Sequence, residues 1–424
     1  MHMSRLPLRF DRLPIPLLLL FSLLFVQCGD GDADAGDGKT LRFAHFWSEP
    51  TQKVHLQKRI DAFIAKHPGV RVELIDMSWD GGKQKLFAMF DGDQVPDVIE
   101  LGSDWVPQFS ESGRLLDLTQ VKGKVGEIPE QIIEPGSWQG KVYARPWIVA
   151  ARGLFVNTDM LAEAGIDSTS LTTWEGILDA SEAINTKYKV INPPKYGFGA
   201  NGADRNRLYK KILPFFWSNG GNLFDASGKP TLNDPKNIEA LDFYLTLARN
   251  GKLETQKELD QLFLQGRVAF WMSGPWLVDR IAQENPSLNY RVIPMPSLNG
   301  KPGVGIAGGE YLAVNAESPN KDLAVELLNF LTSTDEALAL SKDLKGGFMP
   351  ADFAGISDPY LKEGAQAAFA AEMKNARMTP VHPQWLEIQD ILEINVERAL
   401  KGEMDASEAL NNAQAEVNEL IGAV

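Results

Sequence analysis

The sequence predicts an α/β protein with at least two lobes and a mainly parallel sheet. Short apolar segments typical of strands alternate with segments of helical periodicity, and this order implies crossover connections between parallel strands. The chain has 424 residues, 44% of them hydrophobic, with 10 Trp, 21 Phe and 8 Tyr, which is enough apolar surface for two or three cores.

The elements of the first part of the chain follow from their apolar pattern. Residues 41–47 (LRFAHFW) are almost all apolar, as in a strand buried on both faces. Residues 51–66 place apolar side chains close to helical spacing, and a Pro-Gly pair ends that helix. Residues 70–74 alternate with period two, and 97–101 (DVIEL) form the next predicted strand.

The second part of the chain repeats this order. Its apolar pattern predicts strands at 152–157 and 267–272 and a helix at 171–184. Further helices are predicted to start after Ser318-Pro319, to end before Gly402, and to start after Asp405, where Asp405 and Glu408 form a capping box.

Charge and cysteine content exclude several classes of protein. The formal net charge is −14, and the absence of a Lys/Arg-rich run argues against a nucleic-acid partner. An acidic surface also disfavours charge-driven adhesion to anionic lipid. A single Cys excludes an internal disulfide framework and a Cys-based zinc site, and no His pair has metal-ligand spacing, so no metal is predicted.

The first 27 residues are predicted to be a signal peptide. Basic residues precede the apolar run 17–26, which is about half the length needed to span a bilayer. Cys28 and the polar, Gly-rich residues 28–39 follow, so the start resembles a bacterial lipoprotein signal in which Cys28 is acylated and 28–39 form a flexible tether. Gln27 departs from the small residue that this pattern prefers before the Cys, and cleavage after Ala35 is the alternative.

Catalytic motifs are absent, whereas tryptophans are placed as in a carbohydrate-binding site. There is no nucleophile elbow, zinc-protease helix or dinucleotide-binding turn. Acid pairs such as Asp97 and Glu100 leave a glycosidase open as an alternative. Six tryptophans lie at or near a predicted strand end, turn or helix start, where an open α/β sheet binds ligands: Trp47, Trp105, Trp147, Trp217, Trp276 and Trp385.

Six segments, in order, resemble the extracellular sugar-binding proteins of ABC importers, the maltose-binding-protein-like class. They are PDVIELGSDWVPQFSESGRLLDLT (96–119), GKVYARPWIVAARGLFVNTDML (140–161), GGNLFDASGKPTLNDPKNIEALDF (220–243), FLQGRVAFWMSGPW (263–276), GGEYLAVNAESPNKDLAVELLNFLTSTDEAL (308–338) and ALKGEMDASEALNNAQAEV (399–417).

The resemblance implies the two-lobed periplasmic-binding-protein fold, in which each lobe is a mainly parallel sheet flanked by helices and several strands form a hinge. The first lobe is expected to hold 40–144 and 312–345, and the second 148–307 and 354–424. The chain is expected to cross between the lobes near 144–147, 308–311 and 346–353.

The resemblance also implies which residues bind the ligand. They are Trp47, Ser48, Asp104, Trp105, Arg152, Trp217, Trp276, Gly309, Glu310, Tyr311 and Trp385.

The expected function is capture of a mono- or disaccharide, with a glucoside among the candidates, without catalysis and without a cofactor. The protein is expected to be an exported monomer in the periplasm or at the cell surface. The partners implied are the permease subunits with their ATPase, and a bacterial membrane through the lipid anchor. The same fold with a polyamine or peptide ligand, and a secreted carbohydrate-active enzyme, are the alternatives.

Overall fold

The computed structural model describes residues 39–422 except 80, 93–94, 124–125 and 206. The predicted signal peptide, Cys28 and the tether up to residue 38 lie outside the described residues. The described part falls within a single unit, Gly38–Val424. None of its helices is both long enough and apolar enough to cross a membrane.

A six-stranded sheet contains the first predicted strands. Parallel β2, β1 and β3 form one side, and β12 lies antiparallel between β3 and β6, with β13 at the edge. The bounds are β1 Thr40–His45, β2 Arg71–Asp76, β3 Val98–Gly102, β6 Ala144–Ala151, β12 Ala307–Val314 and β13 Met349–Pro350.

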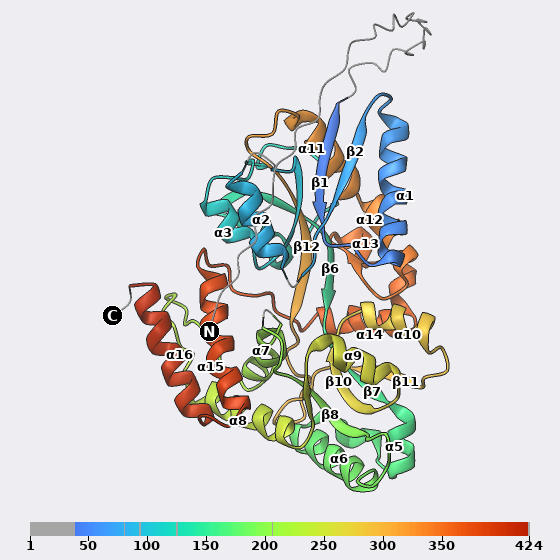
Figure 1. The fold of residues 1–424 in the computed structure, drawn as a ribbon, viewed down its shortest axis with the longest axis vertical. Coiled ribbons are helices and arrows are strands. Elements are labelled where there is room, and N and C mark those ends of the chain that lie inside the picture. The colour runs from blue at the N-terminus through green and yellow to red at the C-terminus, as the bar shows by residue number, and fades with distance from the viewer. Residues whose placement is uncertain (1–38, 80, 93–94, 124–125, 206, 423–424) are drawn as a thin grey trace, which may run out of the picture. The chain divides into compact units, whose positions relative to one another are not determined.

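Both faces of this sheet are buried, as the run of apolar residues in β1 predicts. Phe43 packs with helices α1, α11 and α12, whereas its neighbour Ala44 belongs to the core beneath α2 and α3, because successive strand residues point to opposite faces. Figure 1 shows α1 and α2 on opposite sides of β1. The bounds are α1 Pro50–Lys66, α2 Gly82–Phe90, α3 Val106–Glu111, α11 Lys321–Leu331 and α12 Thr334–Leu344.

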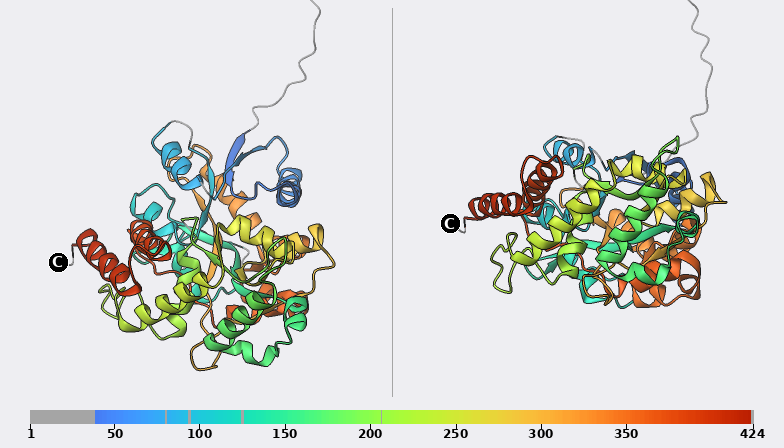
Figure 2. Two further views of the ribbon diagram at one scale, coloured as in Figure 1. Left: turned by 60° about the horizontal axis from the view of Figure 1, so that its bottom comes forward. Right: turned by 90° about the horizontal axis from the view of Figure 1, so that it is seen from below.

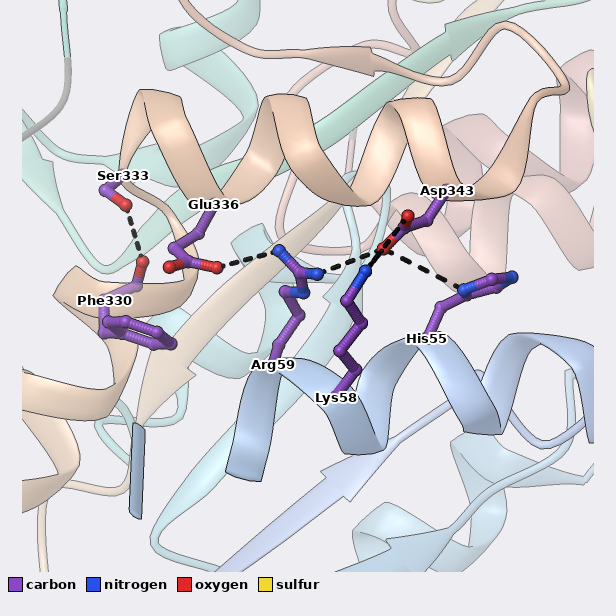
Figure 3. Close-up of polar contacts among 7 residues, drawn as sticks. All are labelled: His55, Lys58, Arg59, Phe330, Ser333, Glu336 and Asp343. Atoms are coloured by element: carbon purple, nitrogen blue, oxygen red, sulfur yellow. Dashed lines mark hydrogen bonds and ion pairs between the residues drawn. The ribbon is translucent and has the colours of Figure 1, made fainter. Parts of the chain in front are cut away.

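A group of ion pairs joins α1 to α12 (Figure 3). Arg59 places Nη1 3.0 Å from Glu336 Oε2 and Nη2 3.0 Å from Asp343 Oδ2. Lys58 Nζ lies 2.9 Å from the same Asp343 oxygen, and His55 Nδ1 lies 4.0 Å from it. These contacts attach α12, the helix before the predicted crossing at 346–353, to a helix almost 300 residues earlier in the chain.

A five-stranded sheet follows in the second part, in the order β11, β7, β10, β8, β9. β10 runs parallel to β8 and antiparallel to β7. The bounds are β7 Gly153–Asn157, β8 Tyr196–Asn201, β9 Lys252–Glu254, β10 Val268–Ser273 and β11 Tyr290–Ile293. The helices are α5 Thr158–Ala164, α6 Trp174–Lys187, α7 Tyr209–Ser218, α8 Pro235–Arg249, α9 Gln256–Leu264 and α10 Trp276–Glu284.

The remaining helices come from the C-terminal part. Helices α15 and α16 pack side by side and contact α8 (Figure 2). Asp405 accepts a hydrogen bond from the backbone N–H of Glu408, which confirms the predicted cap. The bounds are α13 Phe353–Ile356, α14 Gly364–Met373, α15 Trp385–Leu400 and α16 Ala406–Leu420; a short helix α4 Glu130–Ile133 and a hairpin of β4 Ser137–Trp138 with β5 Lys141–Val142 complete the fold.

The structure confirms the α/β class, but both sheets are mixed rather than mainly parallel as predicted. Strand β6 continues directly into β7 and β12 returns beside β6, and antiparallel neighbours of this kind need no crossover helix. Most predicted elements are present, with bounds shifted by a few residues. The helix predicted from residue 171 begins at Trp174, because the Thr173 hydroxyl accepts a hydrogen bond from Gly176 N and caps it there. The chain passes from the first sheet to the second at Arg152, between β6 and β7. The lobe boundaries and hinge crossings given above stay a prediction.

Candidate functional site

Asp104 stands just after the end of the central strand β3. A Cβ on Gly102 would lie 2.8 Å from Asp104 Oδ1, so glycine is needed for the carboxylate to lie over the strand end. Asp104 is buried, and its Oδ2 accepts a 2.8 Å hydrogen bond from the Tyr209 hydroxyl. Lys210 Nζ lies 4.0 Å from Oδ1. The end of a strand in the first sheet therefore meets the start of α7.

Helix α7 brings a phenol and an ammonium to Asp104. Burial raises the pKa of the Tyr209 hydroxyl, and the nearby Asp104 carboxylate adds to the shift. Burial lowers the pKa of Lys210, while Asp104 favours its charged form. Tyr209 is held from behind, since its backbone N–H donates to Glu393 and its ring meets Trp385 edge-on at 5.6 Å.

Arg152 comes from the connection between β6 and β7. Its backbone N–H donates to Ile306 O, and its guanidinium lies 5.1 Å from the ring centre of Trp276. Burial lowers the pKa of Arg152, while Tyr209 and Asp104 favour the charged form. Its Nε has no hydrogen-bond partner among the described residues.

Trp276 opens α10, directly after β10. Its indole N–H donates to Asp260 Oδ2 at 3.0 Å, and the other oxygen of Asp260 accepts from Trp271 and Ser273. A Cβ on Gly274 would lie 1.9 Å from the Trp276 ring, so only glycine leaves room for it. The ring is half-buried and held in one orientation beside the Arg152 cation.

Glu100 and Glu310 are two carboxylates on adjacent strands of the first sheet. Glu310 on β12 pairs with Gly102 on β3, so Glu100, two residues earlier, lies diagonally on the same face. Burial raises the pKa of Glu100, and Glu310 raises it further. Burial likewise raises the pKa of Glu310 to about 8, against the opposing influence of Trp47 and Lys210.

Seven side chains from the first sheet, the β6–β7 connection and helices α7 and α10 form what we call the polar cluster. It combines carboxylates, cations, a phenol and an indole, and three of its buried polar atoms, Glu100 Oε1, Glu310 Oε2 and Arg152 Nε, have no partner within the described part of the chain. Because unpaired buried polar atoms are costly, the arrangement suits a polar ligand that both donates and accepts hydrogen bonds. The polar cluster consists of Glu100, Asp104, Arg152, Tyr209, Lys210, Trp276 and Glu310.

Four of the predicted ligand-binding residues meet in the polar cluster: Asp104, Arg152, Trp276 and Glu310. Three of its members were not predicted, although each left a signal. Glu100 is an acid within an otherwise apolar strand, a placement that by itself indicates a role for the carboxyl group. Tyr209, Lys210 and Lys211 begin a helix whose next residues, 212–217, are apolar and buried, and charged residues at such a place call for a reason.

The other predicted residues have different surroundings. Trp47 is buried against Trp147 and Phe348, each 5.6 Å away between ring centres, and its side chain opposes the rise in the pKa of Glu100 and Glu310, so it borders the polar cluster. Trp105 is buried edge-on against Phe46. Tyr311 is fully buried, and its hydroxyl donates to the carbonyl of Ile132.

Four further predicted residues lie at other places around the cluster. Ser48 is half-buried in the bend after β1, and Gly309 exchanges hydrogen bonds with Ser103. Trp217 is buried on α7, with the Arg377 guanidinium 5.9 Å from its ring, and Trp385 is buried behind Tyr209.

Metal binding finds no support in the described residues. No group of three or more His, Cys, Asp or Glu side chains within them is arranged to hold an ion. The tertiary structure therefore adds no candidate metal site, within the described residues, to the histidine spacing considered in the sequence.

The chain is similar to solute-binding proteins of bacteria. The sequence pattern of the family described as bacterial extracellular solute-binding protein matches residues 48–338. The diacetylchitobiose binding protein DasA of Streptomyces coelicolor is 28% identical over 338 residues, which cover 76% of this chain and 75% of that protein. A maltooligosaccharide ABC transporter solute-binding lipoprotein of Streptococcus pneumoniae is 23% identical and covers 95% of both chains.

A similar solved structure is an ABC transporter solute-binding protein from Thermotoga lettingae bound with α-D-tagatose. The TM-score is 0.82, the identity is 26%, and the match covers 90% of this chain and 99% of that one.

Proposed function

The chain belongs to the bacterial extracellular solute-binding protein family, and we propose that it captures a mono- or disaccharide and delivers it to an ABC permease with its ATPase. Two lobes, 40–144 with 312–345 and 148–307 with 354–424, close on the sugar about the crossings near 144–147, 308–311 and 346–353. Because the ligand contacts both lobes, it favours the closed form, which the permease receives.

The observation that carries the sugar assignment is the polar cluster with its unpartnered buried atoms. A sugar hydroxyl donates to a carboxyl oxygen such as Glu310 Oε2 and accepts from a cation such as Arg152, while the indole of Trp276 packs on an apolar C–H face. The relatives described above carry names with sugars of different sizes, diacetylchitobiose and maltooligosaccharide, which supports the class rather than one sugar.

Export and anchoring belong to the same proposal. The signal peptide 1–27 directs export, acylated Cys28 holds the protein at the periplasmic or outer face of a bacterial membrane, and a monomer binds sugar without turnover or cofactor. The name of the streptococcal relative, a lipoprotein, supports the anchor. An N-terminal acyl mass on Cys28, lost in Cys28→Ser, tests it; a mature chain that starts at Gly36 contradicts it.

Sugar binding is tested by calorimetric titration with tagatose, maltose and N,N′-diacetylchitobiose. We expect one of them to bind, and Trp276→Ala to weaken that binding about tenfold or more, because the stacking surface beside Arg152 is lost. Trp138→Ala is the matched control: this half-buried indole in the β4–β5 hairpin donates to Glu111 at the end of α3 and is not part of the polar cluster.

Three results would contradict the proposal. Equal losses in Trp276→Ala and Trp138→Ala would place the sugar elsewhere. Binding of spermidine or a short peptide, with none of any sugar, would replace the ligand class. Release of shorter sugars on incubation would indicate a carbohydrate-active enzyme.

A further inference from the structure

The loop between α6 and β8 presents apolar side chains to solvent. Residues 189–194 are all exposed, and Val190 and Ile191 at the centre keep 93% and 42% of their surface accessible. The preceding helix α6, near the foot of Figure 1, instead buries its apolar residues, such as Ile184, in the core. Isolated exposed apolar residues are ordinary, but two adjacent ones at a loop tip form a specific feature.

Contacts at both ends hold this tip in place. At its start, Tyr188 is buried, donates its hydroxyl hydrogen bond to Glu163, and accepts the N–H of Ile191 at its carbonyl at 3.1 Å. At its end, Arg267 Nε donates to the carbonyl of Pro194 at 3.0 Å. The exposed apolar pair is therefore the tip of a loop anchored on both sides.

Four cations surround the tip, and none forms an ion pair with a carboxylate in the described part of the chain. Lys187 and Lys189 precede it, Lys195 lies 4.6 Å over the Tyr188 ring, and Arg267 bonds the Pro194 carbonyl and the side-chain oxygen of Gln265. The chain has 56 acidic and 42 basic residues, so four adjacent unpaired cations stand out. We call Lys187, Lys189, Val190, Ile191, Lys195 and Arg267 the basic rim.

Strand order explains how the rim forms. β8 begins at Tyr196 and runs parallel to β10, which begins at Val268, so the residues before both strands lie at the same edge of the second sheet. Lys195 and Arg267 are thereby neighbours although 72 positions separate them. The acids that act on Tyr188 at the start of the tip are Glu163, which accepts its hydroxyl hydrogen bond, and Asp159, which accepts from Asn289.

We propose that the basic rim is a docking surface for an anionic lipid membrane, with Val190 and Ile191 entering the interface and the four cations contacting headgroups. Lysines near an anionic surface are attracted to it, and apolar side chains between them add burial in the interface. Because the net charge is −14, anionic lipid repels most of the surface and attracts this edge, so the rim also orients the protein. This proposal does not depend on the sugar or on acylation of Cys28.

Vesicle co-sedimentation of the full chain carrying Cys28→Ser tests the rim without an acyl chain. The vesicles are phosphatidylcholine alone or with about 30% phosphatidylglycerol. We expect preferential binding to the anionic vesicles at about 0.05 M salt and loss of that preference at about 0.5 M, where charges are screened over a few Å. The apolar leader is the same in every variant, so the readout is the difference between variants.

Two rim variants have a matched control. The first is a triple variant with Lys187→Gln, Lys189→Gln and Lys195→Gln, and we expect its partitioning onto anionic vesicles to fall about tenfold or more. Val190→Ser with Ile191→Ser removes the inserting groups without changing charge and is expected to lower it about threefold. The control replaces three exposed lysines of the same part of the chain: Lys229→Gln, Lys236→Gln and Lys257→Gln.

The outcomes separate cleanly. An equal loss in the control triple would overturn the proposal, since net charge alone would then account for binding. Equal binding to both vesicle types would also overturn the proposal. Normal vesicle binding by both rim variants would overturn it as well, and impaired sugar uptake in those variants would then indicate that the rim serves a protein partner. Unchanged melting temperatures confirm that the variants are folded.

Discussion

Two groups of charged side chains in this molecule are organised in opposite ways. Between α1 and α12, Arg59 joins Glu336 and Asp343 through two 3.0 Å contacts at a partly exposed interface (Figure 3). In the polar cluster, Glu100 is buried and Glu310 is half-buried, and each has one buried oxygen without a partner among the described residues. In the first group opposite charges are paired with one another, whereas in the second group some buried carboxyl oxygens have no hydrogen-bond donor among the described residues.

The difference teaches where binding and stability reside. Paired charges near the surface add modestly to stability, and they give a ligand few free groups. Unpartnered buried groups cost stability until something bonds them, so their retention fits a binding site. Substitutions in the two groups are therefore expected to change different measured quantities.

The largest expected effect is on sugar affinity in Asp104→Asn. The neutral amide loses a charged acceptor, and hydrogen bonds to charged groups contribute about 1.5–3 kcal/mol, so Kd rises about 10- to 100-fold. Calorimetric titration with the sugar found in the screen measures it. Asp343→Asn is the matched control and should leave Kd unchanged; equal losses would show that the two groups are not functionally distinct.

Arg59→Met should act on stability alone. It leaves Glu336 and Asp343 without their shared partner, and we expect the free energy of unfolding to fall by about 1–3 kcal/mol. Urea denaturation measures it, with sugar Kd as the control. A weaker sugar affinity with unchanged stability would reverse the roles assigned to the two groups.

Glu310→Gln should change how stability depends on pH. The folded-state pKa of Glu310 is raised to about 8 from an ordinary 4.5, so the folded protein holds a proton that the unfolded chain releases. Glu310 therefore contributes a fall in stability as pH rises from 4.5 to 8, and the variant lacks this contribution. We expect the variant to melt a few degrees higher at pH 9 and at the same temperature at pH 4.

The matched control for that experiment is Glu419→Gln, at an exposed position on α16. Its melting temperature should follow the wild type across the whole pH range. A Glu310→Gln variant that behaves in the same way would show that Glu310 is ionised at neutral pH in the folded protein.

The smallest expected effect is that of Lys58→Ala. Its ammonium contacts Asp343 at 2.9 Å, but the side chain is 60% exposed, and exposed ion pairs contribute only a few tenths of a kcal/mol. A melting curve should shift by about a degree or less. A shift as large as that of Arg59→Met would mean that exposure does not rank these pairs.

The order of elements was readable from the sequence because periodicity reports burial directly. The apolar run at 41–47 and the helical spacing at 51–66 reappear as β1 and α1 with shifts of a few residues. Five of the six segments that resemble sugar-binding proteins lie within the family match at residues 48–338, and the sixth, 399–417, lies beyond it. Local pattern was sufficient here because each element buries a face that its own residues define.

The binding site was readable only in part, because position near a strand end does not say which way a side chain points. Trp47 and Trp276 both stand next to a strand end, yet Trp47 is buried among aromatic rings and Trp276 is held beside Arg152. Tyr311 follows Glu310 directly, and alternation along β12 sends its side chain to the opposite face, into the core.

By itself the sequence determined the α/β class, the family, the predicted export signal with Cys28, and four members of the polar cluster. Tertiary structure alone decided which charges meet: Glu100 with Glu310 across two strands, Asp104 with Tyr209 across 105 positions, and Lys195 with Arg267 at one sheet edge. Net charge predicted a surface unsuited to anionic lipid, whereas folding gathers cations into a basic rim. The physical reason is that periodicity is a local property, while electrostatics depends on distances that only the packed chain sets.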